Sequence, residues 1–193
     1  MFKYGRELLY AGVMNVLQEG VFLSIFNLFH SSYILSGFAI FIAEYFPFLL
    51  MAIALLYELF VRKDGETLRS LLRIYFPPFL TMLTTETSKL FFIHPRPFIV
   101  LHIIPLIHVS DPYGSFPSSH AAFFAALAMT MYSCNHKLGK WFFFGALIVG
   151  LGRVAVGVHW PLDVVSGFLI GSVLGYAYEK LISILYKSNN QVC

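Results

Sequence analysis

The chain has 193 residues, of which 58% are hydrophobic and 12% are charged. In soluble domains, about a quarter of all residues are charged. A chain of this size cannot bury so much apolar surface in water, so the bilayer is the expected solvent and one membrane domain is the simplest organisation. The net charge of +3 is spread along the chain without a basic run, so nucleic-acid binding is not expected.

Five apolar stretches predict membrane-spanning helices and hence an all-α bundle. They cover residues 34–60, 71–92, 118–134, 141–158 and 162–186. A span needs roughly 20 apolar residues, so the first stretch is long enough to tilt and the third is short for a full crossing. A loop rich in Pro, His, Asp and Gly separates the second stretch from the third.

Residues 8–29 form a further apolar stretch that has two interpretations. Four positions interrupt it: Asn15, Gln18, Glu19 and Gly20. These interruptions favour an amphipathic helix lying in the outer membrane interface. A sixth span is the alternative, and it would place Lys3 and Arg6 inside, where positive charge is expected. The chain thus divides into an N-terminal helix within residues 1–33, a membrane domain over 34–186 and a cytoplasmic tail over 187–193.

Positive charges indicate which side of the membrane each loop faces. Eight of them gather on one side of the predicted bundle, which is therefore cytoplasmic: Arg62, Lys63, Arg69, Arg73, Lys137, Lys140, Lys180 and Lys187. The opposite side holds Lys89, Arg96 and Arg153. Ionisable groups at membrane depth are costly, so these three cations are candidates for a functional site.

The three cations predict an anion-binding site at the outer face. No nearby acidic run balances Lys89, Arg96 and Arg153, and guanidinium groups match phosphate oxygens in bidentate fashion. The third predicted span begins at Pro117 or Ser118, where free helix N–H groups would face the same anion. The hydroxyl group of Ser118 adds another donor.

Two histidines and an aspartate at the same face add chemistry that simple anion binding does not need. His159 and Asp163 are four residues apart at the start of a helix, so one turn brings them together. An aspartate that is hydrogen-bonded to one ring nitrogen leaves the other nitrogen free to attack an electrophile. His120 is then a second imidazole that can protonate a leaving oxygen.

The order and spacing of these residues resemble the signature of the type 2 phosphatidic acid phosphatase (PAP2) superfamily. That signature is Lys, six residues, Arg-Pro; then Pro-Ser-Gly-His; then Ser-Arg, five residues, His, three residues, Asp. Here the three parts read KLFFIHPRP from Lys89, PSSH from Pro117 and GRVAVGVHWPLD from Gly152. The resemblance covers residues 34–186. The short length and the FIAEY segment at 41–45 are similar to bacterial undecaprenyl-diphosphate phosphatases of this superfamily.

The resemblance implies a role for each matching residue. His159 would form a phosphohistidine, Asp163 would orient it, and His120 would protonate the leaving group. The phosphoryl oxygens would be held by Lys89, Arg96, Ser118, Ser119 and Arg153. Candidates for a supporting role are Glu86, one turn before Lys89, with Pro97 and Pro117. No metal or other cofactor is expected, because the family needs none and the chain lacks a carboxylate cluster suited to Mg²⁺.

Two positions depart from the signature, and two other residues lie near it. Ser119 replaces a glycine but is small and keeps its N–H, so little effect is expected. Gly152 replaces the serine before Arg153, which removes a hydroxyl group that could touch phosphate. Glu44 is expected to face the bundle near the outer mouth. His94 could line the site, although an exposed loop histidine is the more common case.

The expected substrate is a lipid phosphate or diphosphate, with undecaprenyl diphosphate favoured by the resemblance. Phosphatidylglycerophosphate, phosphatidate and a lipid A phosphate are alternatives. The expected location is the bacterial plasma membrane, with the site on the extracytoplasmic face. Besides membrane lipids, a second copy of the chain is a candidate partner, because the repeat of Gly167, Gly171 and Gly175 predicts close helix packing, within the chain or in a homo-oligomer.

Two other functions share the cation cluster. A lipid or anion transporter or binding protein would need the cations but not two imidazoles and an orienting acid, and a transporter more often places ionisable groups near the membrane midplane. A phosphotransferase would pass the phosphoryl group from the same histidine to an acceptor other than water.

Overall fold

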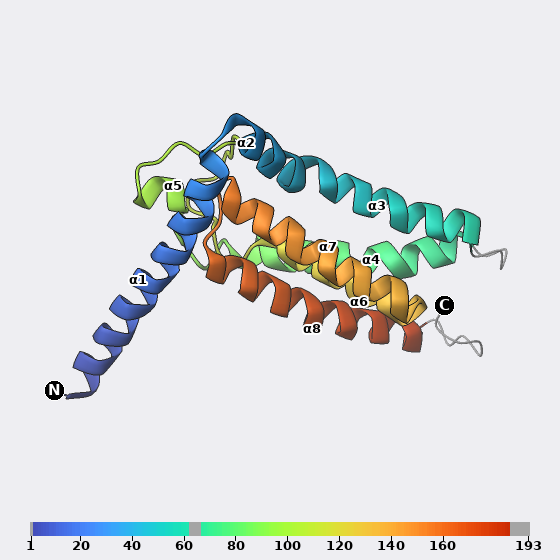
Figure 1. Cartoon of the computed structure of the whole chain (residues 1–193). Coiled ribbons are helices and arrows are strands. Elements are labelled where there is room, and N and C mark those ends of the chain that lie inside the picture. The colour runs from blue at the N-terminus through green and yellow to red at the C-terminus, as the bar shows by residue number, and fades with distance from the viewer. Residues whose placement is uncertain (1, 62–66, 186–193) are drawn as a thin grey trace.

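The computed structural model describes residues 2–61 and 67–185, and these form a bundle of helices (Figure 1). No β-strand occurs in the described parts, so the predicted all-α class is confirmed. The elements are α1 (Phe2–His30), α2 (Tyr33–Ile40), the π-helical turn η1 (Phe41–Tyr45), α3 (Phe46–Leu56), the π-helical turn η2 (Tyr57–Val61), α4 (Thr67–Ser88), α5 (Pro97–Val100), α6 (Ser119–Cys134), α7 (His136–Ala155) and α8 (Pro161–Leu185). The segments from α2 to η2 continue one another and form a single rod, here called the α2–η2 rod.

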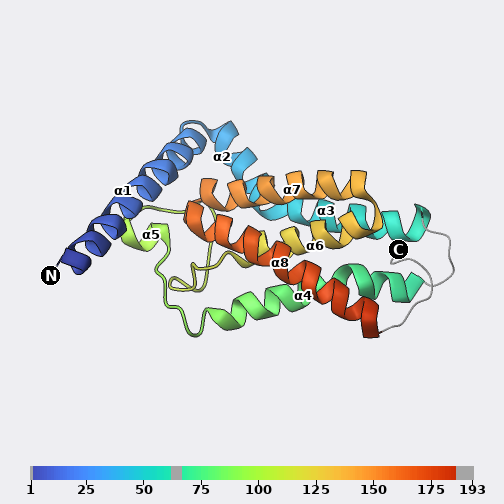
Figure 2. The same cartoon turned by 90° about the horizontal axis from the view of Figure 1, so that it is seen from below.

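α6 is the central helix, with α4, α7 and α8 packed around it (Figures 1 and 2). Eleven of its sixteen residues are buried. Three glycines of α8 line the face that touches α6: Gly167, Gly171 and Gly175. A Cβ atom at Gly175 would lie 2.7 Å from the Cα of Ala126, so a larger residue would force the helices apart. The predicted close packing is therefore confirmed within the chain, and a homo-oligomer stays a prediction.

Three segments of the described chain are long and apolar enough to cross a membrane: Tyr33–Phe60, His136–Ala155 and Pro161–Ile182. They correspond to the first, fourth and fifth predicted spans. α4 is less apolar because of its threonines and charged residues. α6 is ~24 Å long at 1.5 Å per residue, which is less than the ~30 Å bilayer core. These three are candidate spans, and the count of five or six spans stays a prediction.

Four helix ends meet at one end of the bundle, which we call the loop end (Figure 2). α4 and α7 end there, while α6 and α8 begin there. The loop of residues 89–118, which contains the short helix α5, lies at the same end. All three motifs are therefore brought to the loop end, as the predicted topology requires.

α1 leans away from the bundle in both views (Figures 1 and 2). Its residues Phe22 and Phe26 pack against Val154 and Trp160 beside the junction of α7 and α8. It is not among the three apolar segments of the described chain, and both interpretations of it stay predictions. The break between α1 and the α2–η2 rod lies close to the predicted boundary at residue 33, while the predicted tail 187–193 lies outside the described residues.

Candidate active site

Hydrogen bonds across the loop end join the first motif to the third. Arg96 is buried just before α5, and its Nη1 donates to the carbonyl oxygen of Val158 at 2.9 Å. Trp160 donates from Nε1 to the carbonyl oxygen of Pro95 at 3.1 Å. Two further bonds from the guanidinium group of Arg96 hold the loop itself, to the carbonyl oxygens of Asp111 (2.6 Å) and Gly114 (3.0 Å).

Asp163 lies in the first turn of α8, whereas His159 lies in the bend that precedes this helix, so the two residues are brought together at the start of α8 without sharing a helical turn. Both are buried, and His159 Nδ1 lies 3.6 Å from Asp163 Oδ2, slightly beyond hydrogen-bond distance. The same carboxylate oxygen accepts hydrogen bonds from the backbone N–H of Trp160 at 2.9 Å and from the hydroxyl group of Ser115 at 2.5 Å. Oδ2 of Asp163 is therefore held in place facing the imidazole ring.

The other ring nitrogen of His159 faces Arg96. Nε2 lies 3.3 Å from Arg96 Nη1, and because a guanidinium group only donates, Nε2 carries the lone pair and Nδ1 the proton. Burial, together with the positive charges of Arg153 and Arg96, lowers the pKa of His159 from the ordinary 6.5 to about 4. At neutral pH the ring is uncharged, with a nucleophilic nitrogen beside a cation that suits phosphate.

The second motif lies at the first turn of α6. The backbone N–H of Ser118 donates to the carbonyl oxygen of Asp163 at 3.0 Å, which fixes the start of α6 against the start of α8. Ser118 and Ser119 are buried, and the hydroxyl group of Ser118 has no hydrogen-bond partner within the described ranges. The two serine hydroxyls and the free N–H groups of the first turn can bind an anion. His120 lies in the same turn, within electrostatic range of Arg153.

Arg153 and Lys89, the other predicted phosphate ligands, each have an acidic neighbour. Arg153 is buried in the last turn of α7, and its Nη1 lies 3.6 Å from Oε1 of Glu44, which therefore faces the bundle as expected. Lys89 follows α4 and donates from Nζ to Oε1 of Glu86 at 2.8 Å, so the predicted pair forms. The structure thus brings all three cations to the loop end, where Arg153 and Lys89 form ion pairs.

The end of α4 corrects the predicted limit of the second apolar stretch. α4 ends at Ser88, four residues before the predicted limit at Phe92, because the backbone N–H of Lys89 and the next two residues bond to carbonyls three residues back instead of four. This tight turn forms the start of the first motif. Pro97 then starts α5 and leaves Arg96 extended, and Pro117 is buried just ahead of α6. Both prolines therefore shape the backbone on which the motif residues are placed.

Two residues outside the motif pattern also face Asp163. Ser115 is fully buried and bonds to Oδ2, as described above. His94 Nδ1 lies 3.8 Å from Oδ1, and its side chain is 44% exposed. Hydrogen bonds to Tyr113 and Ser115 hold the backbone of His94, so it lines the site instead of being an ordinary loop histidine. The sequence shows that Ser115 lies two residues before the second motif, but it does not show that its partner is Asp163, because the loop conformation decides this.

The assembled site can bind and attack a phosphoryl group. It combines an uncharged imidazole, a fixed carboxylate, three cations and unpaired donors at a helix N-terminus. The cations and donors suit the oxygens of a phosphate, and the imidazole suits its phosphorus atom. Within the described residues, no group of three or more histidine, cysteine, aspartate or glutamate side chains is placed to hold a metal ion.

Sequence comparison relates the chain to membrane phosphatases. The profile of the PAP2 superfamily matches residues 70–186, more than half of the chain. Undecaprenyl-diphosphatase BcrC of Bacillus subtilis (strain 168) is 26% identical over 167 residues, which are 86% of this chain and 84% of that protein. The undecaprenyl-diphosphatase of Sulfolobus acidocaldarius is 34% identical over 100 residues, which are 51% of this chain and 48% of that protein.

Two solved structures share the fold. LpxE of Aquifex aeolicus has a TM-score of 0.64 and 28% identity, with coverage of 83% of this chain and 93% of that chain. The PAP2-type phosphatidylglycerolphosphate phosphatase of Bacillus subtilis has a TM-score of 0.61 and 24% identity, with coverage of 92% and 90%, and supports the fold alone. The family match confirms the resemblance seen in the motifs and identifies an enzyme that hydrolyses phosphoric esters or anhydrides. The chain therefore belongs to the PAP2 superfamily and is an integral membrane lipid phosphatase.

Proposed function

We propose that the protein hydrolyses undecaprenyl diphosphate to undecaprenyl phosphate at the extracytoplasmic face of a bacterial plasma membrane. The observation that supports this most directly is the placement of His159, with Nε2 3.3 Å from Arg96 and Nδ1 facing Asp163. The substrate is supported by the similarity to the two undecaprenyl-diphosphatases.

In the proposed reaction, Nε2 of His159 attacks the terminal phosphorus atom, and the bond from that atom to the bridging oxygen breaks. The lipid monophosphate leaves, and His120, which takes up a proton when the anionic substrate binds, supplies that proton to the leaving oxygen. A phosphohistidine remains on His159. Water then gives a proton to His120 and attacks the phosphorus atom, which releases inorganic phosphate and restores the imidazole. Asp163 keeps the Nδ1 proton in place in both steps.

The cations stabilise the charge on the transferred phosphoryl group. Negative charge spreads over three equatorial oxygens in the transition state, and fixed donors placed around them supply most of the stabilisation. Arg96 has five N–H donors, and four of them face backbone carbonyls and His159. One donor is left for a phosphoryl oxygen. The remaining oxygens would be bound by Lys89, Arg153 and the first turn of α6, with Ser118 and Ser119.

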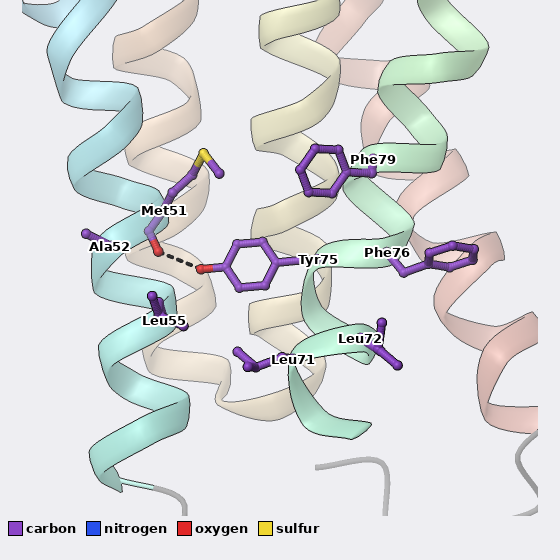
Figure 3. A pocket seen from close by; sticks show the side chains of 8 residues that line it. All are labelled: Met51, Ala52, Leu55, Leu71, Leu72, Tyr75, Phe76 and Phe79. Atoms are coloured by element: carbon purple, nitrogen blue, oxygen red, sulfur yellow. Dashed lines mark hydrogen bonds between the residues drawn. The ribbon is translucent and has the colours of Figure 1, made fainter. Parts of the chain in front are cut away.

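An apolar cavity next to the site supports a lipid substrate. It has a volume of about 260 Å³ and lies between the α2–η2 rod, α4 and α6, with Glu44 and His120 in its lining. A second cavity, of about 430 Å³, shares Met51 and Phe79 with the first and continues between α3 and α4 (Figure 3). Tyr75 spans this second cavity and donates to the carbonyl oxygen of Met51 at 2.6 Å. Such an apolar lining suits an isoprenoid or acyl tail.

The test is phosphate release by the detergent-purified protein from undecaprenyl diphosphate, phosphatidylglycerophosphate, phosphatidate and a lipid A phosphate. We expect the fastest release from undecaprenyl diphosphate and none in the His159→Ala variant. His108→Ala is the matched control, because His108 is an exposed histidine of the outer loop and should retain wild-type turnover. Normal turnover by His159→Ala would contradict the proposed nucleophile.

A second candidate is a phosphatase of phosphatidylglycerophosphate or of a lipid A phosphate. It would use the same reacting groups, and the two apolar cavities could hold its acyl tails in place of an isoprenoid tail. Preferential release from one of these lipids would replace the proposed substrate while keeping the proposed mechanism. Release from none, even with added phosphoryl acceptors, would favour a lipid transporter or an anion-binding protein instead.

A further inference from the structure

Glu44 contributes a negative charge to a site built to bind a negative ligand. It lies on η1, its side chain is 46% exposed, and its Oε1 lies 3.6 Å from Nη1 of Arg153. Arg153 is buried, and its Nε has no hydrogen-bond partner in the parts of the chain that are described. At 3.6 Å the pair is longer than a charge-assisted hydrogen bond. The carboxylate therefore neutralises this arginine in part without binding it tightly.

The backbone around Glu44 is arranged to bring it this close. η1 is a π-helical turn, a feature that arises from one inserted residue and is frequent at functional sites. α7 approaches η1 at Gly152, where a Cβ atom would lie 2.9 Å from Cγ1 of Ile42 and 3.0 Å from the backbone nitrogen of Ala43. The serine of the family signature would collide with η1 at this position. The glycine of this chain therefore allows α7 to approach η1 closely, and this brings Arg153 near Glu44.

Glu44 also lines the cavity beside the reacting groups. The 260 Å³ cavity is bordered by Glu44 at η1 and by His120 at the first turn of α6. A phosphate that reaches Arg153 must therefore lie close to the carboxylate of Glu44. Two anions next to one guanidinium group repel each other and compete for it.

We propose that Glu44 is a positioning residue that pairs with Arg153 in the empty site and competes with phosphate for it. The carboxylate keeps the buried guanidinium group oriented between turnovers. When a phosphoryl group binds, its oxygens replace the carboxylate as the partner of Arg153. After hydrolysis, it favours the departure of inorganic phosphate by recovering its partner. This inference rests on the proposed function, since it takes inorganic phosphate as the product.

The experiment compares Glu44→Gln with the wild type. Glutamine keeps the size of the side chain and an oxygen that can accept from Arg153, but it removes the charge. We expect inorganic phosphate to bind about fivefold more tightly to this variant, the effect of a partly exposed ion pair. The measurements are the inhibition constant of inorganic phosphate during hydrolysis and its dissociation constant by calorimetry without substrate.

Two further variants make the result specific. Glu19→Gln removes the same charge from α1 and should leave phosphate binding unchanged. Glu44→Asp keeps the charge on a shorter side chain and should lie between the wild type and Glu44→Gln. An unchanged or weaker affinity of Glu44→Gln for phosphate would overturn the proposal. If the wild type does not hydrolyse undecaprenyl diphosphate, the proposed function fails, while calorimetry with inorganic phosphate still tests Glu44.

Discussion

Replacing Ser115 by alanine removes one of two hydrogen bonds that hold the carboxylate of Asp163. The hydroxyl group donates to Oδ2 at 2.5 Å, and the side chain of Asp163 is 1% exposed, so water cannot easily take its place. A hydrogen bond to a charged group contributes about 1.5–3 kcal/mol. The Trp160 N–H still binds Oδ2 in the variant, so Asp163 keeps one partner but gains freedom to rotate.

The expected result is a slower enzyme that still binds its substrate. If about 1.4 kcal/mol of the lost bond is expressed in the transition state, kcat falls about tenfold. KM should change little, because Ser115 contacts Asp163 and is not among the residues proposed to hold phosphate. The remaining part of the loss should lower the thermal unfolding midpoint.

The assay is steady-state phosphate release, with thermal unfolding measured on the same preparations. Ser133→Ala is the matched control, since its hydroxyl group donates to the carbonyl oxygen of Met129 within α6, at 3.3 Å. We expect this control to retain wild-type kcat. A wild-type kcat in Ser115→Ala, or an equal loss in both variants, would refute the reasoning that Ser115 acts through Asp163.

Four other predictions use different properties of the site. In nitrogen NMR spectra of labelled histidine, the His159 resonance should titrate near pH 4, and titration near 6.5 would be inconsistent with its burial. Because this pKa is below the ordinary 6.5, the unfolded chain binds the proton more readily, and the free energy of unfolding falls as the pH is lowered from 6.5 to about 4. Activity should survive EDTA, and a loss that Mg²⁺ restores would contradict the metal-free mechanism. His94→Asn, which keeps a polar atom near the Nδ1 position, should retain more kcat than His94→Leu, and equal rates would exclude a contact with Asp163 that affects turnover. A cysteine at the exposed Ile104 should react with an impermeant thiol reagent on intact cells, whereas reaction only after permeabilisation would invert the topology.

The sequence predicted the parts of the molecule that depend on residue type and spacing. Apolar stretches marked the helices, since lipid-facing segments must be apolar over their whole length. The spacing of His159 and Asp163 predicted that their side chains lie close together, and they are 3.6 Å apart, although His159 precedes α8 instead of lying on its first turn. The glycine repeat of α8 predicted close packing, which occurs against α6.

The parts that depend on backbone conformation were not accessible from residue types. Arg96 binds carbonyl oxygens, and every residue has one, so nothing in the sequence marks those of Gly114 or Val158 as its partners. The residue types of η1 do not predict a π-helical turn, yet this turn sets the distance from Glu44 to Arg153. The length of α6 was predicted, but its central place in the bundle was not, because its alanines are compatible with several environments.

The tight contact between α6 and α8 has a consequence for how such enzymes diversify. Substitutions at Gly171 or Ala122 would separate the two helices whose first turns hold His120 and Asp163, so these positions tolerate almost no change. The parts of the two cavity walls that belong to α3 and α4 lie outside this contact between α6 and α8. Selection can therefore reshape the surface that meets the lipid tail while the reacting groups are inherited as one unit.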